Sequence, residues 1–306
     1  MKYATRINSF LRTGLTVREA LNEIGKIDGV GYVDLNYPEH FSGLSVQEMA
    51  ESLEKNRLKV SAVNMRFRDK YIDGVFTNKD EKIRRDAVQL FRQAADVCEA
   101  LRGEQIILWL SYDGYDYPFQ MDYPAAWAWI VQCVKDVCSA TDLPVSIEYK
   151  PYEERVHAIP DSYGTTLALI SEVGAENLGM TLDFCHMLMK KENPAFAASL
   201  LLQKKKLFTV HVNDGEGSTD DGLMVGSVNL WRMLELYYYL KKYDYQGIIY
   251  FDTFPKREEA AQECRINIAM CRKMEEMVDK LGIERISGVI SRQSAAAAMN
   301  MLMELL

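Results

Sequence analysis

Residues 208–213 read FTVHVN and residues 247–252 read GIIYFD, and similar short apolar segments occur at 144–149 (PVSIEY) and 179–183 (GMTLD). Each segment is five or six residues long and rich in β-branched, aromatic or other apolar residues, which is typical of a buried strand. The chain between consecutive segments is long enough for a helix, for example at Leu230–Tyr243. Strands that alternate with helices form a parallel sheet with right-handed crossovers.

The same alternation extends to the N-terminus. We predict further strands at Tyr3–Ile7, Gly31–Asn36, Lys59–Met65 and Gln105–Leu110, and long helices at Glu81–Arg102 and Ala125–Ala140. Eight strand–helix units close into a (β/α)8 TIM barrel, a fold that needs about 250 residues. The 306 residues therefore fit a single domain, 1–306. A doubly wound open sheet is the alternative, but no GxGxxG motif follows the first strand.

The chain continues beyond the last predicted strand. Residues Arg257–Leu281 follow that strand, and residues 282–306 are predicted to form a C-terminal helical extension. Within the extension, Ser291–Leu306 is rich in Ala, Met and Leu and predicts an extra helix. This helix is expected to pack either on the barrel or on a partner subunit.

Composition excludes several classes of partner. The formal net charge is −8 and the basic runs, such as Lys204–Lys206, are short, which argues against nucleic acid. No run of about 18 apolar residues predicts a membrane span. Lys2, Arg6 and Arg12 interrupt any signal-peptide core, so we expect a cytoplasmic protein. None of the six cysteines forms a CxxC pair, which favours buried, reduced thiols.

Metal-capable side chains lie at or near the ends of the last four predicted strands: Glu148, Asp183, His211 and Asp252. If they face inward, they converge at the C-terminal mouth of the barrel, where such barrels hold their active sites. Buried carboxylates and imidazoles are costly unless they are paired or coordinate an ion. The sequence therefore predicts a divalent-metal site. Three carboxylates and one imidazole suit Mn²⁺ first, with Co²⁺, Mg²⁺ or Zn²⁺ as alternatives.

Other residues near this mouth predict a sugar pocket. Lys150 shares a strand face with Glu148, and His186 follows Asp183 by three residues, so it can face the same ion. The loop 214–222 is acidic and contains no Lys or Arg, which disfavours a phosphate group. We therefore expect a small, neutral, unphosphorylated sugar. The residues expected to contact it are Asn36, Asn64, Trp109, Tyr112 and His186.

Three segments resemble motifs of the xylose-isomerase-like barrels, most closely those of the L-rhamnose isomerase type. They are Glu148–Glu153 (EYKPYE), Asp183–His186 (DFCH) and Asp220–Gly226 (DDGLMVG). The similarity covers nearly the whole chain in topology and is most specific over residues 144–255. Gly222 stands where the family has a third aspartate, so one ligand of a second metal is missing.

The resemblance implies a metal-dependent aldose–ketose isomerase that shifts a hydride between C1 and C2. It implies one or two ions per chain and a homodimer or homotetramer. The first ion would be held by Glu148, Asp183, His211 and Asp252, and the second by Asp183, His186, Asp220 and Asp221. Lys150 would stabilise negative charge that develops on the substrate oxygen. The rival route is an enediol mechanism with Glu148 or Asp252 as the base.

Two other functions stay open at this point. One is a ketose 3-epimerase of the D-tagatose 3-epimerase type, which shares the order of metal ligands. Both catalytic acids of that group are glutamates, whereas this chain has Asp252 on the last strand, and Lys150 is not part of that group's pattern. The other is a barrel that binds sugar or metal without turnover. The apurinic endonucleases of this superfold are richer in histidine than this chain, which has four.

Overall fold

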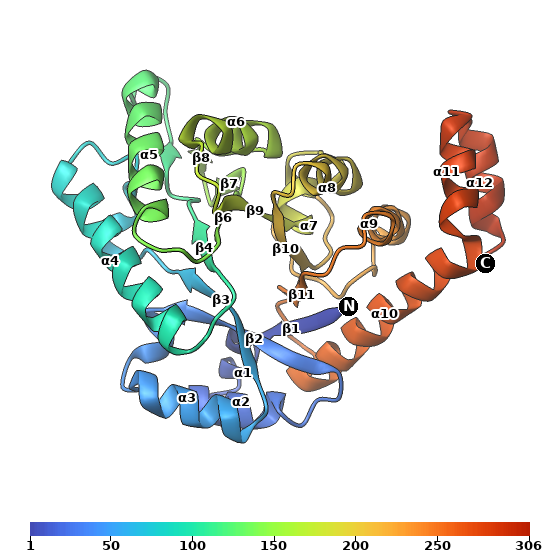
Figure 1. The fold of residues 1–306 in the computed structure, drawn as a ribbon, viewed down its shortest axis with the longest axis horizontal. Coiled ribbons are helices and arrows are strands. Elements are labelled where there is room, and N and C mark those ends of the chain that lie inside the picture. Colours follow the sequence, from blue (N-terminus) through green and yellow to red (C-terminus); the bar gives the residue numbers. More distant parts are fainter.

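A computed structural model describes residues 1–306 as a closed barrel of eight parallel strands surrounded by helices (Figure 1). Each strand is hydrogen-bonded to the next in the order β1 (Lys2–Arg6), β11 (Ile248–Phe251), β10 (Leu207–Val212), β9 (Leu178–Asp183), β6 (Val145–Glu148), β4 (Ile106–Trp109), β3 (Lys59–Met65) and β2 (Val30–Tyr37). All eight strands overlap the predicted ones. The predicted TIM barrel is confirmed.

The strands are apolar because both of their faces are covered. Every residue of β4, β6, β9 and β11 is buried. In a parallel barrel one face of each strand meets the helices and the other packs inside, so near-continuous apolar runs are required. A polar side chain within such a strand therefore needs a specific partner.

Helices follow the strands around the barrel. They are α1 (Ile7–Leu11), α2 (Val17–Ile24), α3 (Val46–Lys55), α4 (Glu81–Ala100), α5 (Tyr123–Cys138), α6 (Tyr163–Val173), α7 (Phe184–Met189), α8 (Pro194–Gln203), α9 (Leu230–Lys242) and α10 (Ala260–Leu281), with 3₁₀ turns η1 (Glu39–Phe41) and η2 (Asp69–Tyr71). Helices α2 and α3 begin at capping boxes, in which Thr16 and Ser45 exchange hydrogen bonds with the glutamate three residues later. None of the helices combines the length and apolar character needed to cross a bilayer.

The strand register brings the strand ends side by side. Trp109 of β4 lies opposite Glu148 of β6. On the other side of the barrel, Asp183 of β9 lies opposite His211 of β10, which in turn lies opposite Tyr250 of β11. Because parallel strands end at the same edge, these five side chains reach one mouth of the barrel.

A small second sheet joins two of the loops at this mouth, and the sequence did not predict it. It consists of β5 (Gly114–Tyr115), β8 (Val156–Ala158) and β7 (Tyr152–Glu153), paired antiparallel. Strands of two or three residues are too short to show any periodicity. The close pairing requires glycine at 114, where a Cβ would lie 1.9 Å from the carbonyl oxygen of His157.

The C-terminal extension forms two helices where the sequence predicted one. After α10, the chain continues as α11 (Ile283–Ser291) and α12 (Ala295–Met303). Figure 1 shows α10 running away from the barrel, with α11 and α12 side by side at its far end. Helix α11 ends at Ser291, and Ser294 then caps the start of α12 by accepting a hydrogen bond from the amide of Ala297.

Candidate metal centre

Four side chains from the ends of consecutive strands meet at the mouth of the barrel. They are Glu148 of β6, Asp183 of β9, His211 of β10 and Asp252, which follows β11. Each offers one ligand atom, and these atoms all lie within 4.8 Å of one another. Glu148, Asp183 and His211 are at most 5% exposed. The structure thus brings together the four residues that the sequence predicted to hold the first ion.

A second group shares Asp183 with the first. It contains Asp183, His186 and Asp220, whose ligand atoms also lie within 4.8 Å of one another. The turn from β9 into α7 positions two of them, because the Asp183 carboxylate accepts a hydrogen bond of 2.9 Å from the backbone amide of His186. Nε2 of His186 lies 3.3 Å from Oδ2 of Asp220. Asp183 is therefore placed between the two groups.

The donor set fits a divalent cation. Both ring nitrogens of His211 and Nδ1 of His186 are buried and have no hydrogen-bond partner. Buried polar atoms without partners are rare. Here the two Nδ1 atoms face Oε1 of Glu148 at 3.5–3.6 Å, and Nε2 of His211 faces Oδ2 of Asp34 at 3.9 Å. Carboxylate oxygens and imidazole nitrogens are the usual ligands of divalent metals in enzymes. A cation would take one ring nitrogen from each histidine and neutralise the carboxylates around it, while the other nitrogen of His211 faces Asp34.

The electrostatics of the cluster lead to the same conclusion. Burial raises the pKa of Asp183, and repulsion from nearby carboxylates raises it further, to about 7. Burial opposes the charged form of both histidines, yet the surrounding carboxylates outweigh it and raise the pKa of His186 and of His211 to about 9. Glu148 is the main carboxylate acting on His211. The cluster therefore stabilises positive charge strongly.

Lys150 lies at the edge of the second group. Its Nζ is 2.5 Å from Oε2 of Glu153 and 3.1 Å from Oδ2 of Asp220. Burial disfavours its charge, but the two carboxylates prevail and raise the pKa of Lys150 above its ordinary value. The ammonium group also lies 5.7 Å from the ring centroid of Trp109. It is thus a fixed positive charge next to the cluster.

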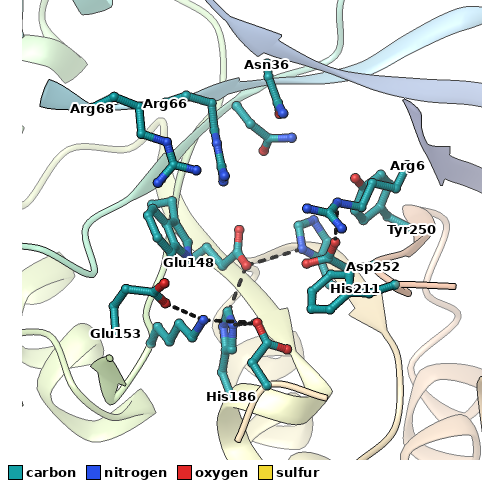
Figure 2. A pocket seen from close by; sticks show the side chains of 15 residues that line it. Arg6, Asn36, Arg66, Arg68, Glu148, Glu153, His186, His211, Tyr250 and Asp252 are labelled. Atoms are coloured by element: carbon teal, nitrogen blue, oxygen red, sulfur yellow. Dashed lines mark hydrogen bonds and ion pairs between the residues drawn. The ribbon is translucent and has the colours of Figure 1, made fainter. Parts of the chain in front are cut away.

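A cavity of about 310 Å³ opens over the cluster. This is the size of a small-ligand site, and polar side chains dominate its wall. Figure 2 shows Glu148, His211 and Asp252 on one side of this cavity and Arg66 and Arg68 on the other. The lining residues are Arg6, Asn36, Asn64, Arg66, Arg68, Trp109, Glu148, Lys150, Glu153, His186, His211, Asp220, Tyr250, Asp252 and Phe254.

The predicted sugar contacts divide into two sets. Asn36, Asn64, Trp109 and His186 line the cavity. Tyr112 does not, because its ring packs edge-on against Trp109 and its hydroxyl accepts a hydrogen bond of 2.9 Å from Arg68. Tyr112 supports Trp109 and Arg68, two residues of the cavity wall, and its role as a sugar contact stays a prediction.

Asp221 also departs from the prediction. Its carboxylate accepts hydrogen bonds from the backbone amide of Glu216, at 2.7 Å, and from the hydroxyl of Thr219, and it belongs to neither candidate metal group. These bonds fold the acidic loop back on itself. Asp221 therefore shapes the loop, while its neighbour Asp220 reaches the cluster.

Gly222 has a structural reason to be glycine. Its φ is +58°, and a Cβ there would lie 2.4 Å from the ring of Phe254. Phe254 in turn lies against the guanidinium of Arg6, at 4.3 Å from the ring centroid. An aspartate at 222 is excluded while Phe254 occupies this place, so the second group keeps only three candidate ligands.

Several lining residues were not predicted as site residues: Arg6, Arg68, Glu153, Tyr250 and Phe254. Arg6 ends β1 and its Nε lies 3.2 Å from Oδ1 of Asp252. The strand-end rule that identified Asp252 applies equally to Arg6, and alternation from Asp252 identifies Tyr250. Arg68 lies three residues beyond the end of β3, so the strand-end rule does not reach it.

The comparisons with known proteins match this architecture. A family model described as a xylose isomerase-like TIM barrel matches residues 19–274. A xylose isomerase from Thermus thermophilus is 26% identical over 223 residues, which are 70% of this chain and 58% of that enzyme. This chain thus spans little more than half the length of that relative.

Solved structures are similar in fold. A D-tagatose 3-epimerase-like protein gives a TM-score of 0.74 at 18% identity, covering 91% of this chain and 100% of the other. The IOLI protein with a bound zinc atom gives 0.66 at 17% identity, covering 91% and 97%. The family model includes all four strands that carry the metal cluster. The chain belongs to the xylose isomerase-like TIM barrel family.

Proposed function

We propose that this protein is a metal-dependent enzyme that moves hydrogen between carbons of an unphosphorylated sugar, and that its reaction is aldose–ketose isomerisation. The observation that carries the proposal is the position of Lys150. Its ammonium group lines the cavity beside the metal cluster and is held by Glu153 and Asp220. A barrel that only binds metal has no need for a cation there.

The residues proposed to hold the first ion are Glu148, Asp183, His211 and Asp252, and a second ion would use Asp183, His186 and Asp220. Mn²⁺ suits this mixture of oxygen and nitrogen donors, with Co²⁺, Mg²⁺ and Zn²⁺ as alternatives. The similar IOLI structure contains a bound zinc atom, which is consistent with a metal-dependent protein. A bound divalent ion supplies Lewis acidity, which polarises a carbonyl or hydroxyl oxygen.

The side chains around the cluster supply the rest of the chemistry. Lys150 is placed to stabilise an oxygen that gains negative charge as the hydrogen moves, because its charge is fixed and desolvated. Trp109, 8% exposed, contributes apolar ring surface to the cavity wall, next to the cationic groups of Arg66, Arg68 and Lys150. Asn36 and Asn64 supply hydrogen-bonding groups for hydroxyls on the opposite wall.

Ketose 3-epimerisation is the second candidate. It is favoured by the similarity to a D-tagatose 3-epimerase-like structure over the whole of that chain. It requires two carboxylates that act on opposite faces of one carbon, for which Glu148 and Asp252 are the candidates. Lys150 favours isomerisation, since proton transfer between two carboxylates does not use it.

One isotope experiment distinguishes the two reactions. The metal-loaded protein is incubated in D₂O with a panel of aldoses and ketoses, and the products are identified by chromatography and mass spectrometry. A hydride shift gives an aldose–ketose pair without solvent deuterium. Epimerisation gives a ketose with deuterium at the inverted carbon, and an aldose–ketose pair with deuterium indicates the enediol route. Absence of any product from any sugar rejects the proposed function.

A further inference from the structure

Two arginines beyond β3 point into the cavity from the side opposite the metal cluster. Asn64, Arg66 and Arg68 alternate with Met65 and Phe67, which are fully buried. Phe67 packs edge-on against two other aromatic rings, Tyr71 at 5.3 Å and Phe76 at 5.9 Å, and so anchors the segment. Figure 2 shows both guanidinium groups directed towards Glu148 across the cavity.

These arginines carry more positive charge than their surroundings neutralise. A single carboxylate, Glu39, serves both of them: Oε1 lies 3.9 Å from Nε of Arg66 and 3.3 Å from Nε of Arg68. Arg68 also donates to the hydroxyl of Tyr112, which is neutral. Nε of Arg66 is buried and has no hydrogen-bond partner. The two guanidinium groups that line this side of the cavity share one ion-paired carboxylate, which leaves one net positive charge there.

The other cations of the cavity differ from this pair. Lys150 has two carboxylate partners, and Arg6 is paired with Asp252. Only Arg66 and Arg68 share one carboxylate between two guanidinium groups. The ring of Trp109 supports both arginines: its centroid lies 5.0 Å from the guanidinium carbon of Arg66 and 5.8 Å from that of Arg68. Trp109 fixes the pair without neutralising it.

We propose that Arg66 and Arg68 bind a carboxylate at the end of the substrate remote from the metal cluster, so that the substrate is a sugar acid rather than a neutral sugar. This inference rests on the proposed function, whose metal cluster fixes the other end of the substrate. A guanidinium group matches a carboxylate in plane and in donor spacing. A single net charge suits a monoanion better than a phosphate dianion.

The test compares matched charged and neutral probes that cannot be isomerised. Calorimetry on the Mn²⁺-loaded protein measures the binding of D-gluconate against D-glucitol and of L-threonate against L-threitol, with D-glucitol 6-phosphate as the phosphate arm. The proposal predicts that at least one acid binds about 10- to 100-fold more tightly than its polyol, and more tightly than the phosphate. Arg66→Gln and Arg68→Gln remove this preference, and Arg66→Lys restores part of it. Arg85→Gln, at an exposed ion pair with Glu81, is the control.

The variants are needed because the carboxylate of an aldonate also chelates metal. A preference that survives in both glutamine variants, or the absence of any preference for an acid, overturns the inference. Tighter binding of D-glucitol 6-phosphate than of either acid overturns the inference in favour of a sugar phosphate. Turnover is not measured, so the outcome is separate from that of the proposed function. If the protein isomerises neutral sugars and binds acids no more tightly than polyols, the proposed function stands and the inference is rejected.

Discussion

Nδ1 of His211 lies 3.5 Å from Oε1 of Glu148, deep in the mouth of the barrel. The same carboxylate oxygen lies 3.6 Å from Nδ1 of His186, so Glu148 touches both candidate metal groups. Its burial raises the pKa of its carboxyl, but the two histidines outweigh burial and lower it below the ordinary value. Glu148 is therefore ionised and ready to bind a cation.

Replacing Glu148 is expected to abolish metal binding. Glu148→Gln removes the charge with little change in shape, and we expect the affinity for Mn²⁺ to fall by more than about 100-fold, since even residues outside the ligand set change affinity by 10- to 100-fold. Glu153→Gln is the matched control, because Glu153 pairs with Lys150 and belongs to neither metal group. Equal losses in the two variants, measured by calorimetry, would place the ion elsewhere.

Replacing Lys150 is expected to reduce turnover without reducing metal binding. Lys150→Met keeps the length of the side chain and removes its charge. Turnover is expected to fall about 10²- to 10³-fold, the usual effect of losing a group that stabilises developing charge, while the Mn²⁺ content is kept. Lys241→Met, at a surface pair with Asp279, should be fully active. Wild-type turnover in Lys150→Met would remove lysine from the mechanism.

Metal affinity is expected to rise with pH. The pKa values of His186 and His211 are raised to about 9, so below that pH both imidazoles hold protons that must leave before a cation binds. The apparent association constant should increase from about pH 6 to about pH 9 and then level off. Calorimetry under nitrogen, in buffers of different ionisation enthalpy, counts the protons released. Affinity that is independent of pH would show that both rings are already neutral.

The strands and the first metal group could be predicted because strand side chains alternate between two faces. Strand residues alternate, strands end at one edge, and a charged residue near the end of a buried strand, such as Glu148 or Asp183, has few alternatives to a shared site. The same reasoning, applied to the first strand, also identifies Arg6.

Most of the features that were not predicted lie outside the barrel strands, in loops whose sequence shows no repeating pattern. Arg68 lies beyond its strand, and its direction is set by the packing of Phe67 against distant rings. Asp220 and Asp221 are adjacent and chemically identical, so only the fold of their loop decides which reaches the cluster. The hydroxyl of Tyr112 accepts a hydrogen bond from Arg68, a long-range contact that the sequence pattern does not indicate. The expectation of a neutral sugar rested on the loop 214–222 and did not include Arg66 and Arg68.

The close contact at Gly222 gives a test of stability. Gly222→Ala forces a side chain onto Phe254 at a positive φ, and we expect the free energy of unfolding to fall by about 2–4 kcal/mol. In a Phe254→Ala background the clash is absent, and the same change should cost only about 1–2 kcal/mol, from the backbone conformation alone. Chemical denaturation of the four proteins measures the difference. Equal costs in both backgrounds would show that Phe254 does not exclude a side chain at 222.

The proposed function requires that the buried cluster hold a metal on which sugar rearrangement depends. The most direct measurement is turnover on the sugar panel, which includes sugar acids, before chelation, after chelation and after addition of Mn²⁺, with the ion content determined in each state. We expect activity to disappear with the metal and to return with it, in wild type but not in Glu148→Gln. Activity that persists in metal-free protein, or that returns equally in Glu148→Gln, would contradict it.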